Sequence, residues 1–374
     1  MIKILIKLTS FIYHFFKKRK IRNKVCFLSR QGNTPGLDFQ LLIASLKEKG
    51  IETYVSCHKV KYSPSYYLVL LKDLFNIANS KVVIIDGYSL AVSNFTHKEE
   101  LKVFQIWHSM GTMKKFGKQI IGKKDGRGEN IAHSLNMHKQ YDYIIASSKE
   151  YAKDLAEGFG YDSSYVHIYS LPRVDLLNNK KYEKEIQDEL YQKYPVLKER
   201  ENITFAPTFK NNNLVLENIK DILSIVDFSK HNLILSLHPL DEKDRIKIKN
   251  LTKENNRVIY DQEHTTFDFL FVSDKLISDY SCVIYDAMVR DIVVFLYVPD
   301  LNQYVEDRGL TIDIEKEYKG YVFKDRKELQ KRINSKIQKE DLTFYQNKRK
   351  KYVVNIDNAN EKLVKFILKE GKIT

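Results

Sequence analysis

Short apolar segments alternate with helical patterns along this chain, and the whole alternation occurs twice. The first series of expected strands covers residues 24–30, 52–57, 81–87, 103–108 and 141–148. Helical patterns lie between several of them, for example at 38–49 and 66–78. Apolar runs of this length that are separated by helices are typical of parallel sheets built from β-α-β units.

The second series follows a charged helical segment, 182–194, which we interpret as an exposed linker. Its expected strands are 202–208, 232–238, 257–261, 275–279 and 292–298. A chain of 374 residues suits two domains, each with its own core. We therefore predict an N-terminal helix at 1–22, Rossmann-like domains at 23–180 and 181–345, and a basic helical tail at 346–374. No GxGxxG fingerprint is present, which disfavours an ordinary NAD enzyme.

The charge balance points to anionic partners. The formal net charge is +14, from 62 basic and 48 acidic residues. Such an excess favours nucleic acid, anionic lipid or phosphate-rich substrates, although a solvated Lys-rich surface would also explain it. Cys26, Cys57 and Cys282 match no disulfide or zinc spacing, so a cytosolic location fits.

The first 20 residues form an apolar segment that is interrupted by Lys3 and Lys7 and has no small-residue cleavage site. It is too short to span a bilayer. On a helix, one face would carry Ile4, Leu5, Leu8, Phe11, Ile12, Phe15 and Phe16, and the other Lys3, Lys7, Ser10, His14, Lys17 and Lys18. This pattern predicts a helix at a membrane interface. The alternative is a helix packed on the protein's own core.

A strand that ends at the only tryptophan, Trp107, leads into His108. A histidine at the exit of a strand can reach a substrate, and its pKa suits general-base catalysis. A basic loop follows, with Lys114, Lys115, Lys118, Lys123, Lys124 and Arg127. The alternative is a core histidine beside a solvated loop.

Two further strand ends carry polar groups. One buried strand ends at His238-Pro239, where proline stops the strand and leaves the imidazole at the edge of the sheet. Another ends at Ser278-Asp279, and a helix is expected to begin near Ser281. A serine hydroxyl and the backbone N–H groups at a helix start can bind an anion. His238 could equally be structural, and Asp279 or Ser281 an N-cap.

Weaker signals come from Pro207-Thr208, where a strand breaks into a loop, and from Arg173, which follows a proline near the expected domain boundary. No cluster of metal ligands stands out, because the acidic segment 241–244 reads as an exposed helix start. We therefore expect no metal and no cofactor.

Taken together and in order, these segments resemble the CDP-glycerol:polyglycerophosphate glycerophosphotransferase family of teichoic acid synthesis. The resemblance covers roughly residues 100–310. It rests on Trp107-His108 with Gly111 and Lys114-Lys115, Pro172-Arg173 with Asp175, Ala206-Pro207-Thr208, His238-Pro239, Ser278-Asp279-Tyr280-Ser281 running to Asp286, and the segment 295–310 with Tyr297, Asp300, Tyr304 and Arg308-Gly309.

The resemblance implies an α/β, GT-B-like fold: two Rossmann-like domains facing a cleft, with the donor nucleotide on the C-terminal domain. It implies attack by an acceptor hydroxyl on the β-phosphate of CDP-glycerol or CDP-ribitol, with release of CMP. The catalytic residues would be His108, as the base, and His238, near the donor diphosphate. Donor contacts are expected from Arg173, Pro207, Thr208, His238, Asp279, Ser281 and Cys282, and acceptor-side or membrane-side charge from Lys114, Lys115 and Lys118.

The acceptor implied is undecaprenyl-diphosphate-linked, and the protein would act peripherally at the anionic cytoplasmic face of the cell membrane, without nucleic acid. Two departures from the family pattern stand out. Ser109-Met110-Gly111-Thr112 replaces the usual Gly-Thr-Pro after the histidine, and Cys282 replaces a second hydroxyl residue after Ser281. The short N-terminal region is similar to that of single-addition priming enzymes.

Two other functions fit parts of the pattern. A GT-B glycosyltransferase or sugar-nucleotide epimerase that uses a UDP-sugar would share the sheet layout, the His-Pro pair and the serine at a helix start. A non-enzymatic protein could bind an anionic membrane or nucleic acid through the +14 charge. No helix-turn-helix or aromatic RNA-binding motif supports nucleic acid.

Overall fold

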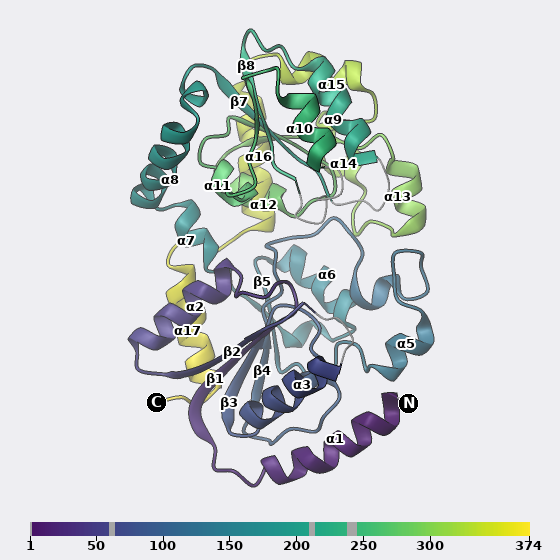
Figure 1. Cartoon of the computed structure of the whole chain (residues 1–374), viewed down its shortest axis with the longest axis vertical. Helices are drawn as coiled ribbons and strands as arrows, with labels where there is room; N and C mark the ends of the chain where they lie inside the picture. Colours follow the sequence, from purple (N-terminus) through teal and green to yellow (C-terminus); the bar gives the residue numbers. More distant parts are fainter. Residues whose placement is uncertain (1, 60–63, 209–213, 238–244) are drawn as a thin grey trace. The chain divides into compact units, whose positions relative to one another are not determined.

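The computed structural model describes residues 2–59, 64–208, 214–237 and 245–374, and divides the chain into two compact units. Unit 1 comprises Met1–Met110, Lys115–Asp175 and Val354–Thr374. Unit 2 comprises Gly111–Lys114 and Leu176–Val353. Each unit is an α/β structure around one parallel sheet (Figure 1).

Within the described residues, unit 1 contains a six-stranded sheet in the order β2-β1-β3-β4-β5-β6, with every neighbouring pair parallel. The strands are β1 (Arg22–Ser29), β2 (Glu52–Cys57), β3 (Ser80–Ile85), β4 (Lys102–Gln105), β5 (Tyr143–Ala146) and β6 (Val166–Ile168). The helices are α1 (Ile2–Phe16), α2 (Leu37–Glu48), α3 (Pro64–Ile77), α4 (Leu90–Ser93), α5 (Glu129–Ser134), α6 (Lys149–Phe159) and α17 (Ala359–Glu370), with 3₁₀ turns η1 (Gly117–Ile120) and η2 (Ser163–Tyr165). Helix α7 (Arg173–Leu177) spans the division between the units.

Unit 2 repeats the plan. Its described residues form a six-stranded parallel sheet in the order β12-β11-β10-β7-β8-β9. The strands are β7 (Glu201–Ala206), β8 (His231–Leu235), β9 (Val258–Tyr260), β10 (Lys275–Ser278), β11 (Val293–Tyr297) and β12 (Val322–Phe323). The helices are α8 (Lys180–Lys193), α9 (Leu214–Ile225), α10 (Arg245–Thr252), α11 (Thr266–Phe269), α12 (Val283–Val289), α13 (Leu301–Asp307), α14 (Ile314–Glu317), α15 (Arg326–Ile333) and α16 (Lys339–Tyr352), with the 3₁₀ turn η3 (Pro195–Lys198).

The strands expected from the sequence correspond to β1–β5 and β7–β11. The two strands that were not expected, β6 and β12, have three and two residues, and each lies at the edge of its sheet. The central strands are fully buried, for example Val293–Tyr297 of β11. Burial on both faces explains why they read as continuous apolar runs.

Helix α1 packs on unit 1 by a face that the sequence pattern did not single out. Thr9 and Tyr13 are buried, and the Tyr13 hydroxyl lies 2.8 Å from Nδ1 of His97. The helix lies beside α3 (Figure 1). Other apolar side chains of α1 remain exposed: Leu5, Leu8, Phe11 and Phe15. The helix is thus part of the core of unit 1 and also carries an apolar strip that faces outward.

The segment expected as a separate tail, 346–374, is divided between the units. Helix α16 belongs to unit 2, whereas Val354–Thr374 belongs to unit 1. Leu363, Val364 and Ile367 of α17 are fully buried, and α17 packs beside α2 (Figure 1). An apolar helix face needs a partner, and the sheet of unit 1 and its helices provide one.

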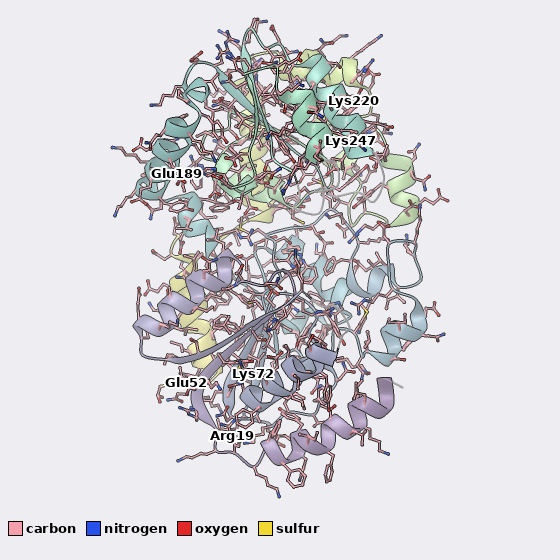
Figure 2. All side chains as sticks on the ribbon, in the orientation of Figure 1. Arg19, Glu52, Lys72, Glu189, Lys220 and Lys247 are labelled. Carbon is pink, nitrogen blue, oxygen red and sulfur yellow. The ribbon has the colours of Figure 1, made fainter. Side chains whose placement is uncertain are left out.

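Helix α8, interpreted as a linker, is attached to unit 2. Arg290 on the loop after α12 forms an ion pair with Glu183 at 2.5 Å, and both side chains are 14% exposed. Glu189 on the same helix, labelled in Figure 2, lies 3.2 Å from Nε2 of His264. Its charged sequence therefore reflects ion pairing on one side and solvent on the other. Among the described residues, no helix combines the length and the apolar character needed to cross a bilayer.

Candidate active site

In unit 1, polar side chains gather where β1, β3 and β4 end. Ser29 is the last residue of β1, Asp86 follows β3, and His108 follows β4. These strands are neighbours in the parallel order β1-β3-β4, so their carboxyl ends lie at one edge of the sheet. Ligands of doubly wound sheets bind at this edge. The sequence pointed to His108 but not to Ser29 or Asp86.

The imidazole of His108 is exposed, and its contacts define its tautomer. Nδ1 lies 2.9 Å from the backbone carbonyl oxygen of Asp86, which can only accept a hydrogen bond. Nδ1 therefore carries the proton, and the lone pair of the neutral ring is on Nε2. The side-chain amide of Gln31 lies 3.1 Å from the same Nδ1 and is best oriented with its oxygen toward it. This arrangement leaves Nε2 as the basic nitrogen.

Trp107 has a left-handed backbone conformation, with φ of 55°. This region is unfavourable for a bulky residue and costs about 1–3 kcal/mol. The indole ring offsets this by packing, with its centroid 4.1 Å from that of His108 and 5.0 Å from that of Phe116. The strained residue and its aromatic neighbours thus orient the histidine that follows.

Arg173 belongs to the same region of unit 1. Its Nε donates to Oδ2 of Asp38 at 2.9 Å, and its backbone N–H donates to Oδ1 at 3.0 Å. Its Nη2 lies 3.2 Å from the carbonyl oxygen of His108. Asp38 is buried in the first turn of α2. The structure therefore places Arg173 beside His108 and not in the unit that holds the other expected donor contacts.

The Asp86 side chain is a buried carboxyl group next to the histidine. Ser29 Oγ donates to its Oδ2 at 2.7 Å. Burial raises the pKa of Asp86 to about 6, and the hydrogen bond from Ser29 opposes this shift only in part. A carboxyl group with such a pKa changes its charge close to neutral pH, beside a candidate base.

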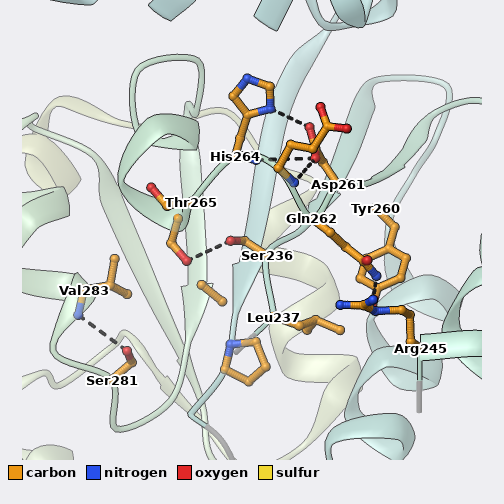
Figure 3. A pocket seen from close by; sticks show the side chains of 14 residues that line it. Ser236, Leu237, Arg245, Tyr260, Asp261, Gln262, His264, Thr265, Ser281 and Val283 are labelled. Carbon is orange, nitrogen blue, oxygen red and sulfur yellow. Dashed lines mark hydrogen bonds and ion pairs between the residues drawn. The ribbon is translucent and has the colours of Figure 1, made fainter. Parts of the chain in front are cut away.

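Unit 2 contains a pocket of about 320 Å³ (Figure 3). It is lined by residues at or after the ends of β7, β8 and β9, together with Ser281 and Val283 near the start of α12. The size is within the range of small-molecule sites. Of the expected donor contacts, Pro207 and Ser281 line it. Sequence reasoning missed its other polar residues, which are Ser236, Arg245, Tyr260, Asp261, Gln262, Glu263, His264, Thr265 and Thr266.

Asp279 connects two of these strand ends. It is 1% exposed, and its Oδ1 accepts hydrogen bonds from the backbone N–H groups of Thr208 at 2.8 Å and Tyr280 at 2.6 Å. Ser278 Oγ also donates to the carbonyl oxygen of Ala206 at 2.6 Å. Asp279 and Thr208 thus hold the loop after β7 in place beside the pocket.

Ser281 and Cys282 precede α12, which has seven residues. Ser281 lines the pocket, and its Oγ accepts a long hydrogen bond of 3.5 Å from the Val283 N–H (Figure 3). Cys282 is the N-cap residue, makes no side-chain capping bond and is not among the pocket-lining residues. His238 lies outside the described residues, although Leu237 just before it lines the pocket.

An ionised cluster forms one wall of the pocket. Nδ1 of His264 lies 2.6 Å from Oδ2 of Asp261, which also accepts a bond from Lys193 at 3.1 Å. Desolvation alone would lower the pKa of His264, but the hydrogen bonds to Asp261 and Glu189 outweigh it and raise that pKa. The pKa of Asp261 is well below its usual range, because hydrogen bonds from Glu263 N–H, His264 and Lys193 outweigh its burial. The cluster fixes the chain after β9.

The three lysines expected on the acceptor side are divided between the units. Lys114 belongs to unit 2, where it bridges to Leu310, and Lys115 and Lys118 belong to unit 1. Burial, followed by repulsion from Lys139, lowers the pKa of Lys118.

Gly111 is needed in unit 2, because a Cβ there would lie 2.5 Å from ring atoms of Tyr285. In the described part of the chain, no group of three or more His, Cys, Asp or Glu side chains could hold a metal ion.

Two parallel-sheet units of this kind define a GT-B-like protein. Solved structures of the wall teichoic acid polymerase TagF share the fold, with a TM-score of 0.74, 17% identity and coverage of 99% of this chain and 95% of theirs. A UDP-GlcNAc 2-epimerase from Neisseria meningitidis also shares it, with a TM-score of 0.60, 16% identity and coverage of 92% and 100%. At such identities these likenesses concern the fold alone.

The sequence model of the CDP-glycerol:poly(glycerophosphate) glycerophosphotransferases matches residues 10–369, and the chain belongs to this family. A teichoic acid ribitol-phosphate primase of Bacillus spizizenii is 28% identical over 268 residues, which are 70% of this chain and 68% of that protein. A teichoic acid glycerol-phosphate primase of Bacillus subtilis is 26% identical over 307 residues, or 80% and 76%. The chain spans 45% of the ribitol-phosphate polymerase TarK of Staphylococcus aureus, to which it is 29% identical. The protein is therefore a transferase of this family, which disfavours both the UDP-sugar enzyme and the non-enzymatic binding protein.

Proposed function

We propose that this protein transfers a polyol phosphate unit, glycerol phosphate or ribitol phosphate, from a CDP-polyol to a hydroxyl group of a teichoic acid acceptor, and releases CMP. The observation that carries the proposal is a family match over residues 10–369 combined with His108 at the strand edge of unit 1. Relatives named as glycerol-phosphate and as ribitol-phosphate enzymes both occur, so the polyol is left open between these two.

The transfer step follows from the tautomer of His108. Nε2 takes the proton of the acceptor hydroxyl while its oxygen forms a bond to the β-phosphorus, which carries the polyol. The bond from the β-phosphorus to the bridging oxygen breaks, and CMP leaves with that oxygen and the bonding electron pair. The backbone carbonyl oxygen of Asp86 accepts a hydrogen bond from Nδ1–H and so stabilises the imidazolium that forms. Phosphoryl transfer depends chiefly on such positioning and on offsetting phosphate charge.

The donor nucleotide is assigned to the pocket of unit 2. Tyr260 and Gln262 offer an aromatic ring and an amide for the pyrimidine base, and the guanidinium of Arg245 lies close to them (Figure 3). Ser281 lies on another side of the pocket and offers a hydroxyl to the diphosphate (Figure 3). His238, in the segment just after Leu237, is proposed as a further diphosphate contact, and Thr208, Asp279 and Cys282 as supports of the phosphate end.

We propose that the acceptor is attached to a lipid carrier, undecaprenyl diphosphate, at the cytoplasmic surface of the membrane. The support is helix α1, whose outward strip includes Leu8 and Phe11 at 61% and 67% exposure. Lys7 on the helix and Lys17 and Lys18 just after it suit anionic headgroups. The protein would bind this surface peripherally, and Lys114, Lys115 and Lys118 would attract the anionic acceptor.

The experiment that tests the proposal is CMP release from CDP-glycerol and from CDP-ribitol, with a lipid-linked acceptor that carries or lacks one glycerol phosphate. We expect release that depends on acceptor and on one of the two donors. UDP-GlcNAc serves as the control donor. If folded protein turned over the UDP-sugar but neither CDP-polyol, the proposal would be wrong.

A further inference from the structure

We propose that Arg30 and Arg127 form an anion site in unit 1 that binds a phosphate group of the acceptor. The inference that the anion comes from the acceptor rests on the proposed function. The anion site itself rests on the geometry around one aromatic ring, that of Tyr88. Arg30 and Tyr88 lie outside residues 100–310, the part of the chain on which the family resemblance was based.

Both guanidinium groups lie over the ring of Tyr88. The central carbon of Arg30 is 5.4 Å from the ring centroid, and that of Arg127 is 5.5 Å from it. The three residues come from separate parts of unit 1: Arg30 follows β1, Tyr88 lies between β3 and α4, and Arg127 precedes α5. The fold thus brings two permanent positive charges to a single ring.

Two positive charges beside the same ring repel each other, and an anion bound with them would offset this repulsion. Among the described residues, no carboxylate forms an ion pair with either guanidinium. One nitrogen in each group, Nε of Arg30 and Nη1 of Arg127, is buried and has no hydrogen-bond partner in the described part of the chain. Both side chains remain partly exposed, so a ligand can reach their outer nitrogens. Cation–π contacts offset part of the cost, but they supply no hydrogen-bond acceptors in the plane of the guanidinium.

The ring is fixed before any ligand binds. The Tyr88 hydroxyl donates to the carbonyl oxygen of Leu135 at 2.6 Å and accepts from Nδ2 of Asn94 at 3.0 Å. A rigid ring limits the positions of the two guanidinium groups. A guanidinium group can donate two parallel hydrogen bonds to two oxygens of one phosphate. A site with fixed guanidinium groups therefore favours phosphate over a monatomic anion such as chloride.

The site adjoins the candidate base. Arg30 lies between Ser29, which binds the Asp86 carboxyl group, and Gln31, whose amide lies 3.1 Å from Nδ1 of His108. Tyr88 is two residues beyond Asp86, whose carbonyl oxygen accepts from the same Nδ1. A phosphate bound here would hold the polyol to which it is attached within reach of His108. The acceptor, and not the donor in the pocket of unit 2, therefore fits this site.

The test is direct binding, which needs no turnover. The dissociation constant of sn-glycerol 3-phosphate is measured by ligand-detected NMR on the full chain, with and without saturating CDP, and glycerol serves as the probe that lacks a phosphate. The variants are Arg30→Gln and Arg127→Gln. The matched control is Arg19→Gln, which removes a guanidinium 3.7 Å from the Phe75 ring centroid near α1 (Figure 2).

We expect sn-glycerol 3-phosphate to bind both with and without CDP, and glycerol not to bind. Each of the two variants should weaken phosphate binding about tenfold or more and leave the affinity for CDP unchanged. Arg19→Gln should change neither affinity. Thermal unfolding midpoints within a few degrees of the unaltered protein would show that the variants are folded.

Three results would overturn the inference: no binding of sn-glycerol 3-phosphate, unchanged binding by both variants, or displacement of the phosphate by CDP. The last would place the anion in the donor pocket. Failure of the proposed function gives a different pattern, in which CDP does not bind and no CMP is released, while phosphate binding still responds to Arg30 and Arg127.

Discussion

Arg173 binds both carboxylate oxygens of Asp38, through its backbone N–H and its guanidinium, and the same guanidinium reaches the carbonyl oxygen of His108. The side chains of Arg173 and Asp38 are 18% and 6% exposed. One ion pair thus connects the start of α2, the start of α7 and the residue proposed as the base. The ion pair thereby holds the backbone carbonyl group of His108 in position.

Removal of one partner from this pair should cost stability and activity together. Asp38→Ala leaves the Arg173 charge buried, so we expect a loss of about 3 kcal/mol in the free energy of unfolding and a fall in kcat. Arg326→Met is the control, because its ion pair with Asp221 is 52% and 29% exposed and should contribute less than about 1 kcal/mol. Urea unfolding and CMP release measure the two effects. Equal losses in both variants would show that Arg173 and Asp38 have no special role.

His108→Ala should reduce kcat about 10²–10⁴-fold, because it removes the group that takes the hydroxyl proton. The dissociation constant for CDP should stay unchanged, since His108 does not line the pocket proposed for the nucleotide. His133→Ala, an exposed histidine on α5, is the matched control. Near-normal turnover of His108→Ala would exclude it as the base.

Ser281→Ala should weaken CDP binding about tenfold, through loss of one hydrogen bond to a charged group. Cys282→Ser should have a smaller effect than Ser281→Ala, because Cys282 does not line the pocket and would support the phosphate end only indirectly. Ser224→Ala changes an exposed serine on α9 and serves as the control. Calorimetric titration with CDP measures all three variants, and tighter binding by Cys282→Ser would show that position 282 contacts the diphosphate.

Asp86→Asn should change how stability depends on pH. The pKa of Asp86 is raised from 3.8 to about 6 in the folded protein, so the folded state binds the proton more tightly than the unfolded state. Asp86 therefore lowers stability progressively as pH rises from about 4 to 6, by up to about 3 kcal/mol. The asparagine variant should lose this slope and gain stability relative to the unaltered protein above pH 6. Asp73, whose pKa burial also raises to about 6, keeps its own slope in both proteins.

Leu8→Glu combined with Phe11→Glu should reduce binding to vesicles that contain anionic lipid about tenfold or more, because two apolar side chains no longer enter the lipid. The thermal midpoint should not change, since both side chains are exposed. Deletion of residues 1–20 is a poorer test, because it removes the buried Thr9 and Tyr13. Ile246→Glu, which alters a side chain that is 76% exposed on α10, is the control. If the double variant bound vesicles normally, α1 would not be the membrane contact.

The repeated apolar runs predict the two sheets well, because central parallel strands bury both faces and so have a distinctive composition. They do not predict β6, in which all three residues are only partly buried, or β12, which has two residues. The buried face of α1 was also missed. Thr9 is polar, so hydropathy gives no indication that it is buried. In the structure its hydroxyl donates a hydrogen bond to the Leu5 carbonyl oxygen at 2.7 Å, which makes its burial possible.

The candidate site was predicted less completely than the fold. His108, Arg173 and Ser281 stand next to a tryptophan, a proline and an Asp-Tyr pair, which mark them in the sequence. Ser29 and Asp86 carry no such mark and enter the site only because β1 and β3 end beside β4. The available signal was positional, since polar residues at the carboxyl ends of strands share one edge. Strand order, which a single sequence does not contain, was needed to choose among them.

The return of α17 to unit 1 has a consequence for biosynthesis. A ribosome delivers residues 176–353 before Leu363, Val364 and Ile367, so unit 2 has all its strands when unit 1 still lacks a helix that covers its sheet. The unit that begins first is therefore completed last. Until residues 354–374 emerge, the chain exposes the apolar surface beside α2, and we expect chaperones to bind this surface.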